Sequence, residues 1–154
     1  MEKLPVLGAD GSTGVPGLYV VGDLTGIPLL KLAADTGARA VWTIVVQPSF
    51  VKRDRRADIR DLVIVGGGVS GLSAALEAKR IELDFLILEA SEPFSTIVNF
   101  PKKKPIYTYP TAKIPAGDLQ LTATQKEPLL EELRRQAAEA GIAPKVAHAD
   151  RVRR

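Results

Sequence analysis

The chain has 154 residues, of which 45% are hydrophobic and 25% are charged, as in one soluble globular domain. Only 5% are aromatic, so the core should be aliphatic, which suits parallel strands covered by helices and disfavours a small all-β domain. The chain contains no cysteine, which excludes disulfide scaffolds, thiolate metal sites and a Cys-x-x-Cys redox pair.

The distribution of apolar and charged residues favours a cytoplasmic protein. No stretch approaches the roughly 20 apolar residues of a membrane span, and the start, Met-Glu-Lys-Leu-Pro, lacks the pattern of a signal peptide. The net charge of +3 comes largely from basic clusters at 52–60, 102–104 and 151–154. Because these clusters lack interleaved aromatics or a recognition helix, we expect no nucleic-acid binding. The lack of a long apolar stretch likewise predicts no membrane partner.

The first third of the chain predicts one strand and one helix. Residues 18–22, Leu-Tyr-Val-Val-Gly, form an apolar run after a turn signal at 15–17, which predicts a buried strand. Apolar residues recur at helical spacing over 28–46, and Gly37 inside this helix would permit close packing. Residues 48–60 are polar and charged, as in a linker.

The most informative pattern lies between residues 61 and 89. A compact β-branched run at 61–65 is followed at once by Gly66-Gly67-Gly68-Val69-Ser70-Gly71, and residues 72–80 have helical periodicity. A second apolar run at 85–88 ends at Glu89. Strand, glycine turn, helix and strand together predict a βαβ unit.

The remaining third predicts an irregular excursion, a helix and a strand. Residues 91–123 carry several prolines and no sustained period, which is typical of a functional loop. An amphipathic helix is predicted over 126–140, with Gly141 as its C-cap and a capping box formed by Thr124 and Glu127. Residues 145–152 predict the last strand.

The glycines at 66–71 match the requirements of a phosphate loop. Gly66 permits the tight turn, Gly68 the close approach of a pyrophosphate, and Gly71 close packing of helix against strand. The N–H groups and positive dipole end of the helix starting near Val69 would face the phosphates. The alternative is an ordinary glycine turn without a ligand.

Glu89 follows the last glycine at roughly the 20-residue spacing of dinucleotide-binding motifs. A carboxylate at the end of the second strand can accept hydrogen bonds from an adenosine ribose and repels a 2′-phosphate. This favours FAD or NAD over NADP. The alternative is a glutamate that is merely solvated.

Residues 61–89, DLVIVGGGVSGLSAALEAKRIELDFLILE, resemble the FAD-binding start of the FAD-dependent pyridine nucleotide-disulfide oxidoreductases, which include thioredoxin reductase. Residues 15–41 resemble the closing motif of that family, and residues 95–121 are similar to its flavin-side region. The resemblance implies that Asp23 contacts the ribityl and pyrophosphate region of FAD and that Gly22 makes room for it. The expected cofactor-binding residues are Gly66, Gly67, Gly68, Val69, Ser70, Gly71, Glu89, Ala90, Gly22 and Asp23.

The order of these motifs is the reverse of the family's, because Gly22-Asp23 here precedes the glycine loop. The chain is therefore either a natural permutation or a piece from the junction of a longer tandem flavoprotein. The predicted fold is an α/β, Rossmann-like three-layer FAD/NAD(P)-binding domain, permuted or partial, with a parallel sheet. The predicted sheet order is 145–150, 84–88, 61–65, 18–22. Residues 1–47 supply the Gly-Asp strand and helix, 48–60 the linker, and 61–154 the Rossmann half.

The resemblance implies the FAD-binding part of a thioredoxin-reductase-like oxidoreductase. Electrons would pass from NAD(P)H, bound outside this chain, through FAD to an unknown acceptor. The alternative is a non-catalytic nucleotide-binding or interaction module that works through a partner chain. The chain departs from the family in having Ser95 and Thr96 where a second glycine pair is usual, and no catalytic residue or metal ligand can be named.

Three further expectations concern the aromatic loop, the histidine and the open sheet. Tyr107 and Tyr109 could stack on the flavin, although aromatics in long loops more often anchor the loop to the core. His148 is expected to be structural or surface-exposed. Right-handed crossovers that move one way place their helices on one face of the sheet. We therefore expect the other face to be covered by a homo-oligomer or by the remainder of a longer flavoprotein.

Overall fold

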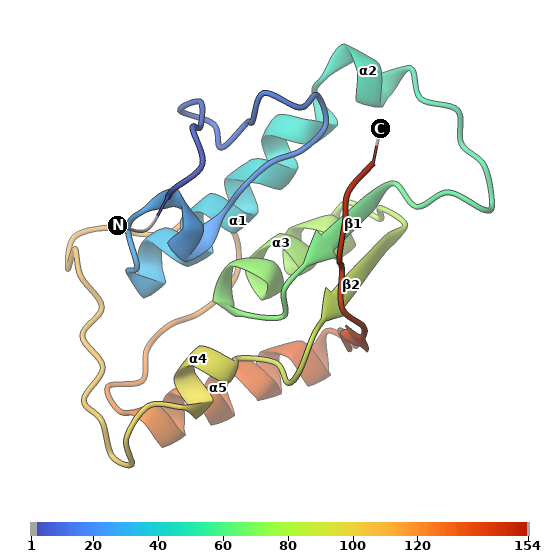
Figure 1. Ribbon diagram of the computed structural model, residues 1–154. Coiled ribbons are helices and arrows are strands. Elements are labelled where there is room, and N and C mark those ends of the chain that lie inside the picture. The colour runs from blue at the N-terminus through green and yellow to red at the C-terminus, as the bar shows by residue number, and fades with distance from the viewer. Residues whose placement is uncertain (1–2, 154) are drawn as a thin grey trace.

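The computed structural model describes residues 3–153 and has an α/β fold with a parallel sheet, as predicted (Figure 1). Its elements, in chain order, are η1 (Gly22–Thr25), α1 (Leu30–Val45), α2 (Pro48–Val51), β1 (Leu62–Val65), α3 (Val69–Arg80), β2 (Phe85–Glu89), α4 (Ser95–Val98), α5 (Lys126–Glu139) and β3 (Lys145–Val146).

The sheet has three strands in the order β1-β2-β3, and both pairings are parallel. Leu62 pairs with Phe85, and Leu88 with Lys145. The last strand is shorter than the predicted 145–150. The final ladder bond runs from the Ala147 N–H to the Glu89 carbonyl, and beyond it the chain has no β2 residue to pair with.

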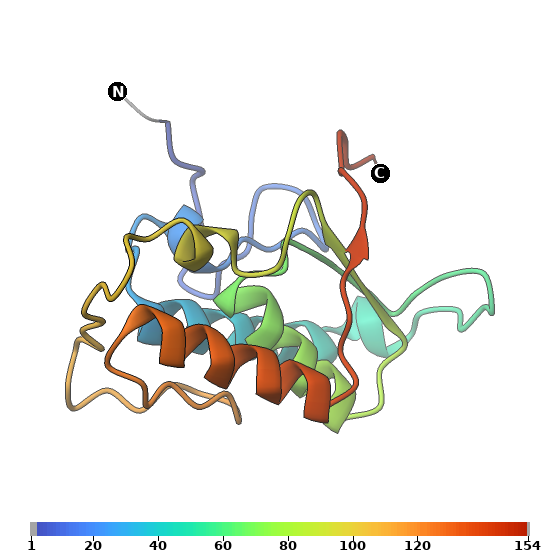
Figure 2. The same ribbon diagram turned by 90° about the horizontal axis from the view of Figure 1, so that it is seen from below.

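The three long helices α1, α3 and α5 lie on the same side of the sheet (Figure 2). Ile64 and Ile87 point toward these helices and are only 8% and 4% exposed. Val63 and Val65 point to the other side, where the rest of the described chain leaves them 50% and 62% exposed. The expectation that the helices share one face is confirmed, and the opposite face of β1 is open.

The excursion at 91–123 does not close that open face. Its middle part crosses the outer side of α1, where the Ala116 N–H donates to Asp35 Oδ1 at 2.8 Å and Lys113 pairs with the same carboxylate at 3.3 Å. Part of the excursion is helical, since α4 follows directly on Phe94. The middle of the excursion therefore lies outside the helices, and the face of the sheet that carries Val63 and Val65 stays exposed.

Helices α1 and α3 pack closely because small residues line their contact. A Cβ on Gly37 would come within 2.2 Å of the Ser70 carbonyl oxygen, so only glycine allows this approach. The buried Ser73 hydroxyl donates to the Ala34 carbonyl at 2.6 Å and joins the two helices. The prediction that Gly37 permits close packing is confirmed.

The predicted strand at 18–22 is wrong, and so is the four-stranded sheet order. Tyr19 forms only an isolated antiparallel bridge with Ser12, and the chain turns into η1 at Gly22. The Val20 N–H donates to the Gly11 carbonyl at 2.9 Å, so backbone groups of this segment bond within a local hairpin. The segment pairs with these nearby residues and does not pair with the edge of β1.

The ends of α5 show one confirmed cap and one correction. Gly141 has φ of +66°, and the N–H groups of Gly141 and Ile142 donate to the carbonyls of Ala138 and Ala137, which is the bonding of a Schellman motif. The predicted capping box is wrong, because the N-cap is Gln125 and makes no side-chain cap. The Glu127 carboxylate instead accepts a bond from the Lys103 N–H at 3.0 Å.

Candidate dinucleotide-binding site

The turn between β1 and α3 is held by its first and last glycines. Gly66 has φ of +108°, a conformation that side chains disfavour, and its N–H donates to the Leu88 carbonyl at 2.7 Å. A Cβ on Gly71 would lie 2.0 Å from the Gly66 carbonyl oxygen. Gly71 therefore allows the first turn of α3 to press against the end of β1, as predicted.

The middle of the loop faces open space. A Cβ on Gly68 would meet nothing within 4 Å in the described part of the chain. Gly68 is the N-cap of α3, and no described side chain caps the helix. The first N–H groups of a helix have no partner within it and attract anions. The loop thus combines space with hydrogen-bond donors, which is what a pyrophosphate requires.

Glu89 lies beside this loop and is bonded to it. Its Oε2 accepts a hydrogen bond from the Gly67 N–H at 2.7 Å, and its Oε1 accepts one from the Ser91 N–H at 3.0 Å. Burial alone would raise the pKa of the Glu89 carboxyl, but these bonds outweigh burial and leave the pKa below its ordinary value. Glu89 is therefore a carboxylate at neutral pH, with lone pairs left to accept further bonds.

The structure brings Gly22 into contact with the glycine loop. Gly22 has φ of +72°, and a Cβ at this position would lie 2.6 Å from Ser70 Oγ. The Gly22 N–H donates to Thr36 Oγ1 at 2.9 Å, and Thr25 Oγ1 donates to the Gly22 carbonyl at 2.8 Å. Two motifs separated by about 45 residues of sequence thus come together at one point.

Asp23 is among the residues that line a cleft of about 570 Å³. The cleft is also lined by residues 17–21, by β1, by parts of the glycine loop, and by residues of α1, α3 and α4. The Asp23 side chain is exposed and makes no hydrogen bond among the described residues, so it is free to meet a ligand.

A second cavity, of about 480 Å³, is lined in part by Gly67. Its walls are mostly apolar, with Leu72, Ile87, Ile142 and Pro144 from α3, β2 and the turn after α5. The glycine loop thus contributes to both cavities, with Gly67 in this one and Gly66 and Gly68 in the cleft. The sequence did not reveal this cavity, because much of its lining comes from α5 and the turn after it, which carry no motif.

The other residues singled out in the sequence fall in three places. Ser95 and Thr96, from α4, line the cleft and extend the set of candidate contacts. Ala90 is exposed directly after β2. Tyr107 and Tyr109 stack on each other with ring centroids 6.1 Å apart and are not among the residues lining the cleft, so flavin stacking is not supported.

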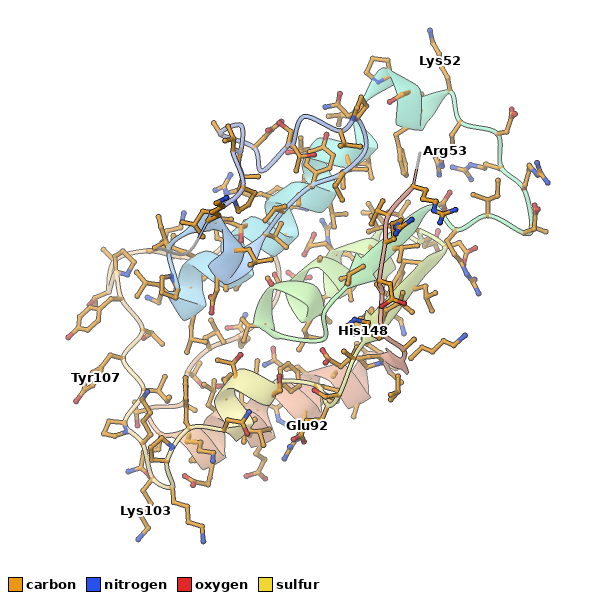
Figure 3. All side chains as sticks on the ribbon, viewed as in Figure 1. Lys52, Arg53, Glu92, Lys103, Tyr107 and His148 are labelled. Atoms are coloured by element: carbon orange, nitrogen blue, oxygen red, sulfur yellow. The ribbon has the colours of Figure 1, made fainter. Side chains whose placement is uncertain are left out.

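Tyr107 points away from the body of the molecule, and its pair of rings is more than half exposed, so it does not anchor the loop either (Figure 3). His148 is exposed and pairs with the exposed Asp150 at 3.3 Å, as expected of a surface residue. Within residues 3–153, no cluster of three or more potential ligand side chains could hold a metal ion. None of the described helices has the length and hydropathy needed to cross a membrane.

Comparison with known proteins identifies the family. The family described as pyridine nucleotide-disulphide oxidoreductase matches residues 63–145, which is more than half of the chain. Bacilliredoxin reductase Bdr from Bacillus subtilis (strain 168) is 31% identical over 67 residues, covering 44% of this chain and 20% of that protein. The bacillithiol disulfide reductase Bdr (YpdA) from Staphylococcus aureus is 25% identical over 55% of this chain and 27% of its own, with a TM-score of 0.45.

The matched segment begins inside β1 and leaves residues 15–41 outside. The part of the chain that matches the curated Bacillus relative spans about a fifth of that protein's length. The glycine loop, Glu89 and the helix that follows the excursion all lie within the matched range. The chain belongs to the pyridine nucleotide-disulphide oxidoreductase family.

Proposed function

We propose that this chain is the FAD-binding part of a flavin-dependent oxidoreductase. The observation that carries the proposal is the empty space in front of Gly68, at the uncapped start of α3, with Glu89 bonded beside it. A glycine loop that served only as a turn would not need this open, donor-lined face.

Each part of the cofactor has a matching environment. The N–H groups at the start of α3 would hold the pyrophosphate, and Glu89 would accept bonds from the adenosine ribose, with the apolar cavity beside Gly67 for the adenine. The flavin half would extend into the 570 Å³ cleft, where Asp23 and Thr96 supply polar contacts. When bound, FAD supplies the electron-transfer chemistry, and this chain binds and orients it.

We infer that the electrons come from NAD(P)H bound outside this chain. We propose an acceptor of the bacilliredoxin class, which is supported by the curated relative named bacilliredoxin reductase. Because the chain has no cysteine, any dithiol that takes part must be on the acceptor or elsewhere in the assembly. The same absence favours a second candidate, a non-catalytic nucleotide-binding module that works through a partner chain.

FAD retention tests the proposal. The purified protein is incubated with FAD, desalted, and its flavin absorbance is measured for the wild type, Gly68→Asp and Gly14→Asp. A Cβ at Gly14 also meets open space, but Gly14 lies outside both cavities, so this variant controls for the added carboxylate. We expect the wild type and Gly14→Asp to retain flavin and Gly68→Asp to lose it, because a charge there repels the phosphates.

Equal retention by Gly68→Asp would show that the loop is not the site. A wild-type protein that retains no flavin but binds ADP would favour the nucleotide-binding module over the flavoprotein.

A further inference from the structure

The bond between Glu89 and Gly67 has no obvious part in holding a ribose. Oε2 of Glu89 accepts the Gly67 N–H at 2.7 Å, and Oε1 accepts the N–H and the hydroxyl of Ser91 at 3.0 and 3.4 Å. These donors belong to the protein, so the carboxylate is anchored at both oxygens before any ligand binds. The loop and the end of β2 are thereby joined through one side chain.

Gly67 needs such an anchor because it lies between two other glycines. Glycine has the widest conformational freedom of any residue, so a run of three is poorly defined unless tertiary contacts restrain it. Three bonds restrain the first two positions: Gly66 N–H to Leu88, Phe94 N–H to the Gly67 carbonyl, and Gly67 N–H to Glu89. Only the bond from Gly67 to Glu89 depends on a side chain, and its acceptor is a charged carboxylate, which makes it stronger than a bond between neutral groups.

We propose that Glu89 is a positioning residue for the phosphate loop: by holding the Gly67 N–H, its carboxylate sets the conformation in which Gly68 and the start of α3 meet a pyrophosphate. This inference rests on the proposed function, since it assigns the loop to phosphate binding. Oε2 accepts only the Gly67 N–H and so keeps a lone pair for a ribose hydroxyl. The same side chain can therefore contact the ribose and hold the phosphate loop.

A ligand without ribose hydroxyls separates positioning from direct contact. The affinities of ADP and of 2′,3′-dideoxy-ADP are measured by calorimetry for the wild type, Glu89→Ala, Glu89→Gln and Glu131→Ala. Glu131 is exposed on α5 and controls for the loss of one negative charge. We expect Glu89→Ala to weaken both ligands about tenfold or more, Glu89→Gln to weaken both less, and Glu131→Ala to weaken neither.

If Glu89→Ala weakens ADP but leaves dideoxy-ADP unchanged, Glu89 contacts only the ribose and the inference is wrong, while the proposed site stands. If the wild type binds neither ligand, the proposed function fails.

A second readout requires no ligand. We expect amide hydrogen exchange at Gly67 to become at least tenfold faster in Glu89→Ala and to stay unchanged in Glu131→Ala, because only the first loses the acceptor of that N–H. Unchanged exchange at Gly67 in a folded Glu89→Ala protein would overturn the positioning role, whatever the affinities are.

Discussion

The βαβ unit at 62–89 and the segment at 17–25 carry the two motifs of the same expected site, but they are built differently. In the βαβ unit each strand finds its partner one crossover away, and β1 and β2 pair in register along the whole of β1. The segment at 17–25 makes a local hairpin and then reaches the site through a tertiary contact between Gly22 and Ser70. A local motif can therefore define its own geometry, whereas a distant one depends on packing.

The largest expected effect distinguishes two glycines within the βαβ unit. Gly71→Ala should lower the free energy of unfolding by about 2–3 kcal/mol, because its Cβ would overlap the Gly66 carbonyl oxygen at 2.0 Å. Gly68→Ala should change it by less than about 0.5 kcal/mol, since its Cβ meets open space. Urea unfolding measures both, and equal losses would contradict the assignment of packing to one glycine and ligand approach to the other.

The open face of β1 predicts association. Val63 and Val65 are 50% and 62% exposed, and their register partners Leu86 and Leu88 lie on the same side of the sheet. This apolar side of the sheet is therefore left partly uncovered by the segment at 17–25 and by the excursion. We propose a homo-oligomer or the remainder of a longer flavoprotein as its cover. Light scattering at micromolar concentration should show association that Leu86→Lys abolishes, because Leu86 lies on this face and is not among the residues that line the 570 Å³ cleft.

A wild-type protein that is a stable monomer and binds no hydrophobic dye would show that this face needs no partner. The same measurement on Val6→Lys, at an exposed valine away from the sheet, controls for the added charge.

The segment at 17–25 should matter for binding more than for stability. Asp23→Ala is expected to leave the free energy of unfolding unchanged, because its side chain is exposed and makes no hydrogen bond among the described residues. FAD affinity should fall about tenfold, corresponding to one lost hydrogen bond. Fluorescence titration with FAD checks this, and unchanged affinity would reduce the Gly-Asp pair to a structural turn.

The smallest expected effect is the pH dependence that comes from Glu89. Its pKa is lower in the folded protein than the ordinary value of 4.5, so its contribution to stability is complete above that pH and is lost as the pH falls through the lower folded-state pKa. The stability difference between the wild type and Glu89→Gln should therefore be constant at pH 5–7 and shrink below about pH 4.5. A difference that grows on acidification would contradict the direction of this pKa shift.

Sequence periodicity predicted the long elements well, because each buries one apolar face in its own neighbourhood. The predicted helices at 28–46, 72–80 and 126–140 agree with α1, α3 and α5 within a few residues. The tasks of Gly66 and Gly71 were also predictable, since both follow from the geometry of a strand that turns directly into a helix.

What the sequence could not predict depends on partners that are distant in the chain. The apolar run at 18–22 has the composition of a sheet strand, yet the hairpin with 11–13 satisfies part of its backbone first. Thr36 as the acceptor for Gly22 carries no motif, and only the packing of α1 reveals it. The bond from Gly67 to Glu89 shows the same limit, because spacing predicts a carboxylate near the loop and not what it holds.

The central claim is that the glycine loop and the Gly22-Asp23 segment bind one cofactor, and amide NMR shifts during titration test it most directly. ADP should shift the amides of 66–71, and FAD should shift these together with those of Gly22 and Asp23, because only the flavin half reaches the cleft. Shifts in 66–71 alone with FAD would contradict the shared site, and no shift in either segment would contradict dinucleotide binding itself.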